Sequence, residues 1–215
     1  MYFCIFNTYS KIIMKNLIYL FAVVCLLSCT GKSLYTIEGT LPSHKYDGEW
    51  IYLVPMENAN RTNVDSFKIK NGYFEFKGDT ERISILRMKP LYRLEMQELL
   101  VITEKGVIKV SIDKNSVAKG TPQNDALQLW KDKQIAFMQM ARKAYVAVRT
   151  GHSVKDSLNW VSKMDSADKD MKNFSIKLLK QQKRNTFGKF LYGQYSFWLS
   201  PADKTRLKPL FEGKK

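Results

Sequence analysis

Histidine and cysteine are scarce in this chain of 215 residues, which has two His and three Cys. A zinc cluster needs three or four ligands and a disulfide framework needs several paired cysteines, so neither class of protein is favoured. Glycine and proline are also few, at 11 and 6, while 45% of the residues are apolar. This balance excludes collagen-like and disordered chains, and it predicts a folded protein with a sizeable core.

Acidic residues are the other shortage, with 20 Asp and Glu against 35 Lys and Arg and a formal net charge of +15. Residues 29–120 carry only +2, whereas residues 121–215 hold 19 basic and 8 acidic residues, a net +11. Two interpretations stay open: a solubilising lysine-rich face, or attraction to an anionic lipid, lipopolysaccharide or an acidic envelope protein. Nucleic acid is not predicted as a partner, because no recognition helix, RNA-binding motif or zinc finger accompanies the charge.

Residues 1–28 predict a secretory signal peptide. Lys15 supplies a short positive segment, and residues 17–27 are eleven apolar residues in succession. As a helix they would rise about 16 Å, roughly half of a hydrocarbon core, which is typical of a signal sequence and too short for a stable span. Residues 1–13 put a further apolar run ahead of the charge, so we expect translation to start at Met14.

The apolar run ends in Leu26-Leu27-Ser28-Cys29. This order resembles the bacterial lipobox, in which a cysteine thiol accepts a diacylglyceryl group before cleavage on its amino side. The resemblance implies that residues 29–33 form a lipidated tether, that Cys29 is the lipid attachment site, and that the anchor makes the membrane a partner. Thr30 follows the cysteine in place of the acidic stretch of surface-exported lipoproteins, so the expected location is the cell envelope, on the outer membrane facing the periplasm. After processing, the mature chain would keep no free thiol.

Residues 34–120 have the two-residue alternation of β-strands and are predicted to form a small antiparallel sandwich or barrel. Asn71-Gly72 lies between two alternating runs, which is the preferred type I′ turn and predicts a hairpin there. A second hairpin is predicted with its turn at residues 104–106. The seven or eight expected strands include residues 35–39, 49–53, 66–70, 73–77, 82–86, 91–94, 99–103 and 107–112.

Residues 121–215 change to a helical period and are predicted to form a basic α-helical module of the hairpin type, which makes the fold class α+β. Thr121-Pro122 predicts one helix start, a second helix opens near Ser153, and Ser200-Pro-Ala-Asp203 is a capping box for a short last helix. Large aromatic residues at helical spacing are expected in the core and not in a stacking platform. These are Trp130, Tyr145, Phe174, Tyr195 and Trp198.

An ordered series of short motifs runs through the β-rich half. It comprises Tyr35-x-Ile37-x-Gly39, Ile51-Tyr-Leu53, Asp65-Ser66, Asn71-Gly72-x-Phe74-x-Phe76-x-Gly78, Glu104-x-Gly106 and Gly120-Thr121-x-x-Asn124. The series resembles the β-rich domain of unknown function at the front of many Bacteroidetes lipoproteins of the thioredoxin-like class, related to AhpC/TSA and thiol–disulfide interchange proteins. Those relatives continue into a Trp-Cys-x-x-Cys redox motif, which has no counterpart in these 215 residues.

The resemblance therefore implies an accessory or binding domain, lipid-anchored and non-enzymatic, of the kind attached to periplasmic thiol–disulfide oxidoreductases. An envelope protein of the thioredoxin-like class is then an expected partner. Two alternatives stay open: a truncated or split oxidoreductase that acts with a separate redox partner, and a carbohydrate- or ligand-binding sandwich. The carbohydrate alternative is motivated by Trp50, Tyr52, Tyr73 and Tyr92.

No catalytic residue, metal ligand or cofactor is predicted. His44 and His152 are far apart in sequence and stand near turn residues, which favours two surface histidines. Asp65-Ser66 has no accompanying base and is expected to begin a strand. Asp165 and Asp168 could converge on one helix face, but neighbouring lysines favour an ordinary solvated face.

Overall fold

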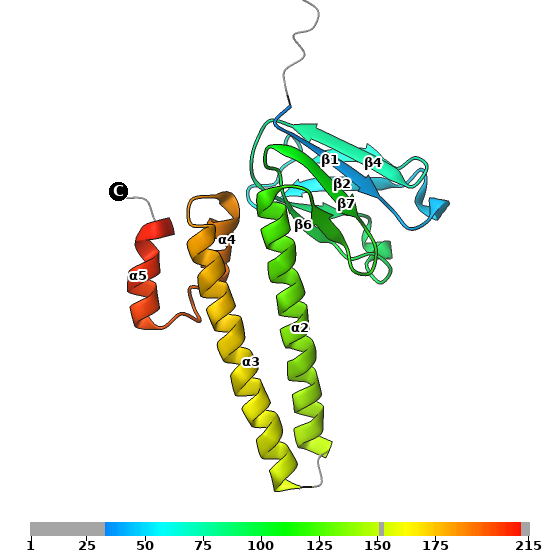
Figure 1. Cartoon of the computed structure of the whole chain (residues 1–215). Coiled ribbons are helices and arrows are strands. Elements are labelled where there is room, and N and C mark those ends of the chain that lie inside the picture. Colours follow the sequence, from blue (N-terminus) through cyan, green and yellow to red (C-terminus); the bar gives the residue numbers. More distant parts are fainter. Residues whose placement is uncertain (1–32, 151–152, 212–215) are drawn as a thin grey trace, which may run out of the picture. The chain divides into compact units, whose positions relative to one another are not determined.

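A computed structural model of the protein describes residues 33–150 and 153–211. Residues Leu34–Lys215 form one compact unit. Within the described residues, eight strands precede four helices, so the predicted α+β class is confirmed (Figure 1). The strands are β1 (Tyr35–Thr40), β2 (Trp50–Pro55), β3 (Asp65–Lys68), β4 (Tyr73–Gly78), β5 (Ile83–Arg87), β6 (Leu99–Ile102), β7 (Gly106–Ser111) and β8 (Val117–Lys119). The helices are α2 (Pro122–Thr150), α3 (Val154–Gln181), α4 (Thr186–Tyr195) and α5 (Pro201–Phe211), with short 3-10 turns η1 (His44–Tyr46) and η2 (Pro90–Tyr92).

The strands form two four-stranded sheets, in the orders β4-β1-β7-β8 and β3-β2-β5-β6. Alternate residues of both sheets share one hydrophobic core, which makes a sandwich with open edges and not a closed barrel. One strand pair departs from the predicted antiparallel pattern, since β1 and β7 run parallel. After β1 the chain returns to the first sheet at β4, leaves it for β5 and β6, and returns again for β7 and β8. β7 therefore reaches the side of β1 through a crossover and not through a hairpin.

The Asn71-Gly72 turn forms as predicted, with φ of 54° and 65°. Its two strands, however, pair only at the bridge between Lys70 and Tyr73. Beyond that bridge β3 joins one sheet and β4 joins the other, so the turn lies at a corner of the sandwich and the predicted hairpin is limited to its first residue pair. The second predicted hairpin is wrong, because β6 and β7 belong to different sheets.

The strand predicted at residues 91–94 is wrong as well. Pro90 opens the η2 turn, and the following residues continue as turns, with Leu91 and Leu94 exposed to solvent. Proline has a fixed φ and no N–H group, which suits the first position of such a turn and not the interior of a sheet. Leu91 and Leu94 thus cover no core here, whereas Tyr92 between them packs against the core of the sandwich.

The helix starts follow the local signals. α2 begins at Pro122, and α3 begins after Ser153, whose hydroxyl accepts a hydrogen bond from the Asp156 N–H. The predicted capping box at α5 also forms, since Ser200 Oγ accepts from the Asp203 N–H at 3.2 Å. Each cap satisfies one backbone donor that the first helical turn would otherwise leave unpaired.

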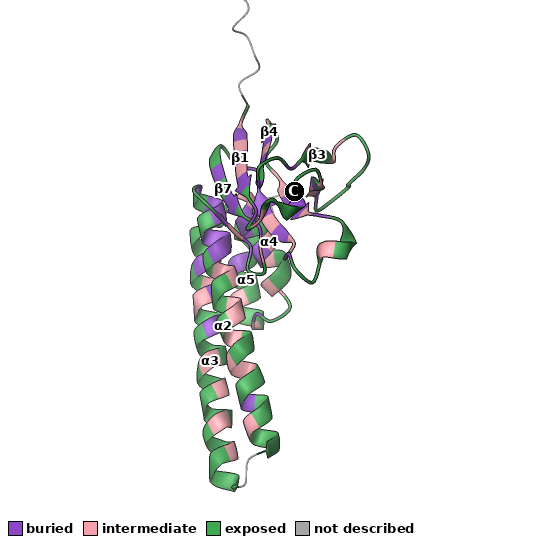
Figure 2. Cartoon of the chain, turned by 90° about the vertical axis from the view of Figure 1, so that its right-hand side faces the viewer, coloured by how far each residue is buried: buried purple, intermediate pink, exposed green. Residues whose placement is uncertain are grey.

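The helices share a second core that sits close to the sandwich (Figure 2). Trp130, Phe174 and Tyr195 pack against it as predicted. The prediction is wrong for Tyr145 and Trp198, which are exposed. α2 and α3 extend beyond the neighbouring helices, and Figure 2 shows the far half of this pair mostly exposed. With only the other helix as a neighbour there, large side chains on the outer faces find nothing to pack against.

A buried polar joint fixes α2 to the sandwich. The Glu104 carboxylate accepts hydrogen bonds from the Gln123 N–H at 2.6 Å and the Asn124 N–H at 3.1 Å, at the first turn of α2. The Asn124 amide then pairs with Ile102 in β6, accepting from its N–H at 2.9 Å and donating to its carbonyl at 2.7 Å. Gln123 continues the joint, because its Oε1 accepts from the Phe187 N–H at 2.9 Å in α4.

These contacts serve two needs at once. An anionic group is favoured at the positive end of a helix, and every buried backbone group needs a partner. The helical module is therefore held to β6 by directional hydrogen bonds as well as by apolar packing. Helices α3, α4 and α5 share the second core with α2 and are thereby held next to the sandwich.

Candidate functional site

A groove of about 720 Å³ lies between α3 and α5. Its α3 wall consists of Lys169 and the residues three, four, seven, eight, eleven and twelve positions after it, which places them on one side of the helix. α5 supplies the facing wall. The lining residues are Lys169, Lys172, Asn173, Ile176, Lys177, Lys180, Gln181, Asp203 and Arg206.

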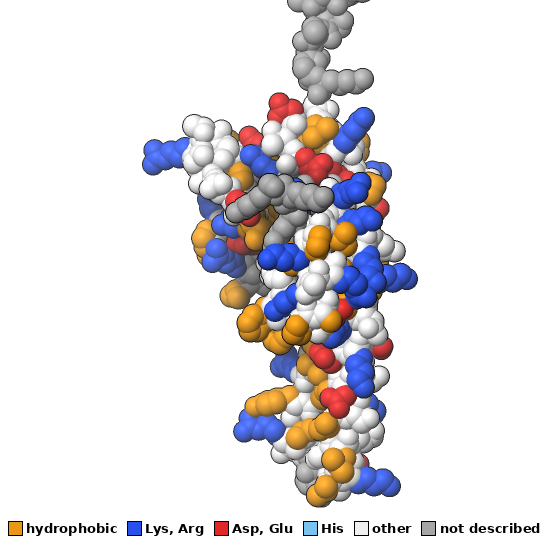
Figure 3. All heavy atoms as spheres, turned by 90° about the vertical axis from the view of Figure 1, so that its left-hand side faces the viewer, with side chains coloured by type: hydrophobic (Ala, Val, Ile, Leu, Met, Phe, Trp, Pro, Cys, Tyr) orange, Lys and Arg blue, Asp and Glu red, His pale blue; other side chains and the backbone are white. Residues whose placement is uncertain are grey.

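The groove is basic because its lining holds five cationic side chains and one acidic residue, Asp203. Residues 171–211 contain nine Lys and Arg and one acidic residue, Asp203. Figure 3 shows the side of the molecule on which α5 lies, where Lys and Arg side chains are numerous around the helices. Ile176 is half-buried and packs on the helical core, so the groove has an apolar patch beneath its charged rim.

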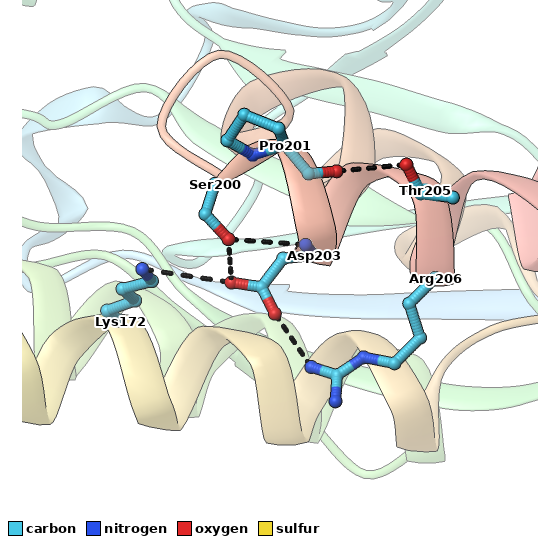
Figure 4. Close-up of polar contacts among 6 residues, drawn as sticks. All are labelled: Lys172, Ser200, Pro201, Asp203, Thr205 and Arg206. Atoms are coloured by element: carbon cyan, nitrogen blue, oxygen red, sulfur yellow. Dashed lines mark hydrogen bonds and ion pairs between the residues drawn. The ribbon is translucent and has the colours of Figure 1, made fainter.

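Asp203 is fully engaged by its neighbours (Figure 4). Its Oδ1 accepts from Arg206 Nη2 at 2.7 Å, and its Oδ2 lies 2.7 Å from Ser200 Oγ and 3.7 Å from Lys172 Nζ. The Ser200 hydroxyl bond, together with the charges of Arg206 and Lys172, holds the pKa of Asp203 below its ordinary value against the opposing effect of desolvation. This carboxylate therefore docks α5 on α3 and stays ionised at neutral pH.

The other lysines of the groove are not matched by acids. Within residues 33–150 and 153–211, no Asp or Glu oxygen lies within 4.0 Å of the Nζ atoms of Lys169, Lys177 or Lys180. Ammonium groups on one helix face, facing a guanidinium on the other wall, form strong charge-assisted hydrogen bonds with phosphate, sulfate or carboxylate oxygens. The arrangement suits binding of an anionic group along the groove.

The residues considered from sequence are placed apart from this groove or outside the described residues. Cys29 and His152 lie outside the described residues. His44 is exposed, with its Nδ1 3.3 Å from Asp47 Oδ2. Asp65 and Ser66 begin β3, as predicted.

Asp165 and Asp168 are exposed on α3. In the described part of the chain, no group of three His, Cys, Asp or Glu side chains is placed to hold a metal ion. None of the helices described there has a stretch that is both long and apolar enough to cross a bilayer.

The four aromatic residues that motivated a carbohydrate surface do not share one face. Trp50 and Tyr52 lie on β2, on the side of that strand away from the core, whereas Tyr73 lies on the outer side of β4 in the other sheet. Tyr92 belongs to the η2 turn, and its ring packs edge-on against Tyr46 with centroids 5.5 Å apart.

Sequence reasoning located the charge but not the groove. The spacing of Lys169, Lys172, Lys177 and Lys180 could have shown that they share a helix face. The position of Arg206 could not be obtained in this way, because it depends on the contact between Asp203 and Lys172, which are far apart in sequence.

Comparison with known proteins bears on the β-rich half. No curated protein and no solved structure matches the chain. Residues 35–127 match a family model described as a domain of unknown function (DUF4369), and this segment runs from β1 to the first turns of α2 and includes the Glu104–Asn124 joint but not the groove. The expected likeness to a domain of unknown function is thereby confirmed for these residues.

Proposed function

We propose that this protein is a non-enzymatic, lipid-anchored protein of the cell envelope, and that its helical module binds an anionic partner in the groove between α3 and α5. The carrying observation is the charge of that groove, where five cationic side chains meet a single carboxylate that is already committed to Ser200, Arg206 and Lys172. A cationic groove of this kind raises the local concentration of anions and orients them by hydrogen bonds.

Attachment rests on the sequence pattern around Cys29. A lipid chain combined with a basic surface is the two-signal arrangement that makes membrane attachment firm. The proposed site is the outer membrane facing the periplasm, with the module available to anionic lipid, lipopolysaccharide or an acidic envelope protein, such as a thioredoxin-like oxidoreductase. Replacement of Cys29 with alanine is expected to release the protein from the membrane fraction; full retention of that variant would refute lipidation at this residue.

Anion binding is tested with a soluble probe, inositol hexakisphosphate, in calorimetric titration against the full chain in detergent. Lys177 and Lys180 are changed together to glutamine, because both line the groove and neither contacts Asp203 in the described ion pairs. Two exposed charge pairs are worth about 1–2 kcal/mol together, so affinity should fall by about five- to thirtyfold.

The matched control changes Lys68 and Lys70 to glutamine. Both are exposed lysines in or next to β3, and the variant has the same net charge as the groove variant. It should bind within about twofold of the wild type, because screening confines the effect of an exposed charge to about 8–10 Å. Equal losses in the two variants would show that net charge alone attracts the probe and would refute the groove.

A further inference from the structure

Two large aromatic side chains stand out from the loop between α4 and α5. Phe197 is 81% exposed and Trp198 is 74% exposed. Their rings meet edge to face, with centroids 5.7 Å apart and planes at 88°. Exposed aromatic residues are ordinary when single, but a contiguous pair on a loop is a feature of interaction sites.

The pair is presented by an ordered turn. The Ser196 N–H donates to the Tyr192 carbonyl at 2.8 Å, and the Trp198 N–H donates to the Tyr195 carbonyl at 2.9 Å. The next residue, Leu199, is buried in the helical core. Because both sides of the pair are tied down, little conformational entropy is lost when the rings enter another environment.

The same loop ends at the basic groove. Ser200 caps α5 and contacts Asp203, which bonds Arg206 and faces Lys172 across the groove (Figure 4). Phe197 and Trp198 are thus three and two residues before Ser200, whose hydroxyl contacts Asp203 in the groove. The helical module therefore carries both the exposed aromatic rings and the lysine-rich wall of the groove.

We propose that this aromatic–basic surface, defined as Phe197, Trp198 and the cations of the α3–α5 groove, docks on an anionic lipid bilayer. The rings enter the boundary between headgroups and acyl chains, and the lysines contact lipid phosphates. This inference rests on the proposed function and names its anionic partner.

Two arguments favour a lipid surface. Trp and Phe are suited to the boundary between headgroups and acyl chains, where an apolar ring is buried and a Trp N–H stays hydrated. Basic residues next to such rings are attracted by the negative potential of anionic lipids, over a range set by the Debye length. Nine basic residues against one acid in residues 171–211 give the charge complementarity.

The test uses the full chain incorporated into vesicles, so that anchoring through the N-terminal segment is the same in every sample. Vesicles contain brominated phosphatidylcholine, alone or mixed with phosphatidylglycerol, and bromine quenches any tryptophan that reaches the acyl chains. We expect stronger quenching in the anionic vesicles, and we expect the Trp198→Phe variant to lose that increase.

Trp160→Phe is the matched control, since this half-buried residue of α3 is outside the proposed surface, and the increase should persist in that variant. Raising NaCl from about 0.1 M to about 1 M shortens the screening length from about 10 to about 3 Å and should remove the increase. Phe197→Ser should weaken it without changing the fold, because the ring is exposed.

Each result decides one of the two proposals. Quenching that depends on both Trp198 and phosphatidylglycerol supports lipid docking. If that dependence is absent while inositol hexakisphosphate still binds the groove, lipid docking is refuted, and the partner is a soluble or protein-borne anion. If hexakisphosphate binding also fails to depend on Lys177 and Lys180, the proposed function is refuted with it.

Discussion

Replacing Asn124 with alanine removes the side chain that joins the sandwich to the helical module. Asn124 has no exposed surface, and Ile102, its partner in β6, has none either. In the variant, the Ile102 N–H loses its bond of 2.9 Å, and Thr121 Oγ1 loses a donor at 2.8 Å. The Ile102 carbonyl loses the amide at 2.7 Å but keeps the Glu104 N–H at 2.8 Å. Water cannot replace these bonds without opening the interface between β6 and α2.

The cost follows chiefly from the buried Ile102 N–H. A buried group left unpaired costs about 1–3 kcal/mol and the lost bond to the carbonyl adds about 0.5–1.5 kcal/mol, so the free energy of unfolding should fall by about 1.5–4.5 kcal/mol. This is a large part of the about 5–15 kcal/mol that holds a typical domain together. With a urea slope of about 2 kcal/mol per molar, the unfolding midpoint should drop by about 0.8–2.2 M.

Two measurements check this expectation. Urea unfolding gives the midpoint, and hydrogen exchange of the Ile102 amide reports the local bond. Asn159→Ala, at an exposed position on α3, is the control and should change stability by no more than about 0.5 kcal/mol. A loss below about 1 kcal/mol in Asn124→Ala, with the Ile102 amide still protected, would refute the role assigned to the joint.

Three further perturbations test other parts of the structure. A Cβ at Gly39 would lie 1.9 Å from Phe74 Cζ, so Gly39→Ala should lower the free energy of unfolding by about 1–3 kcal/mol. Nothing lies within 4 Å of a Cβ at Gly193 in α4, so Gly193→Ala should raise the free energy of unfolding by up to about 1 kcal/mol. Equal melting temperatures of the two variants would contradict this packing. The pKa of Asp203 is lowered in the folded protein, so its contribution is present above the unfolded value of about pH 4 and is lost as pH falls through the folded value. Asp203→Asn should therefore lower the protection of α5 amides, corrected for their intrinsic exchange rates, at pH 7 and should flatten the loss of protection at lower pH. An unchanged acid profile of protection would count against the network. Amides in the far half of α2 should exchange faster than those near Leu127, and uniform protection along the helix would contradict the observed burial.

Local signals in the sequence were sufficient for local structure. Asn71-Gly72 required two residues that accept positive φ, and Pro122 and Ser200 marked helix starts through chemistry that acts within one turn. Such signals need no knowledge of the rest of the fold, which is why these predictions are confirmed.

Strand partners and the groove could not be obtained in the same way. The alternation of β3 and β4 specifies which face of each strand is buried, but it does not specify the sheet that each strand joins. Glu104 and Asn124 were noticeable only as motif residues, because a carboxylate that caps a helix from a distant loop leaves no periodic trace. Trp198 has helical spacing, yet it lies just beyond α4, where no core remains to cover it.

The Asn124 amide also determines how the sandwich ends. An edge strand presents unpaired N–H and carbonyl groups that can recruit a strand from another molecule and start aggregation. At β6, a terminal strand of its sheet, one side chain occupies both groups of Ile102. The edge strand β3 carries the exposed Lys68, whose like charge disfavours the approach of a second copy, whereas Lys77 on β4 is paired with Glu75 at 2.6 Å. Edge-to-edge association is thus opposed at β6 by a side-chain amide that takes the hydrogen-bonding place of a further strand, and at β3 by charge.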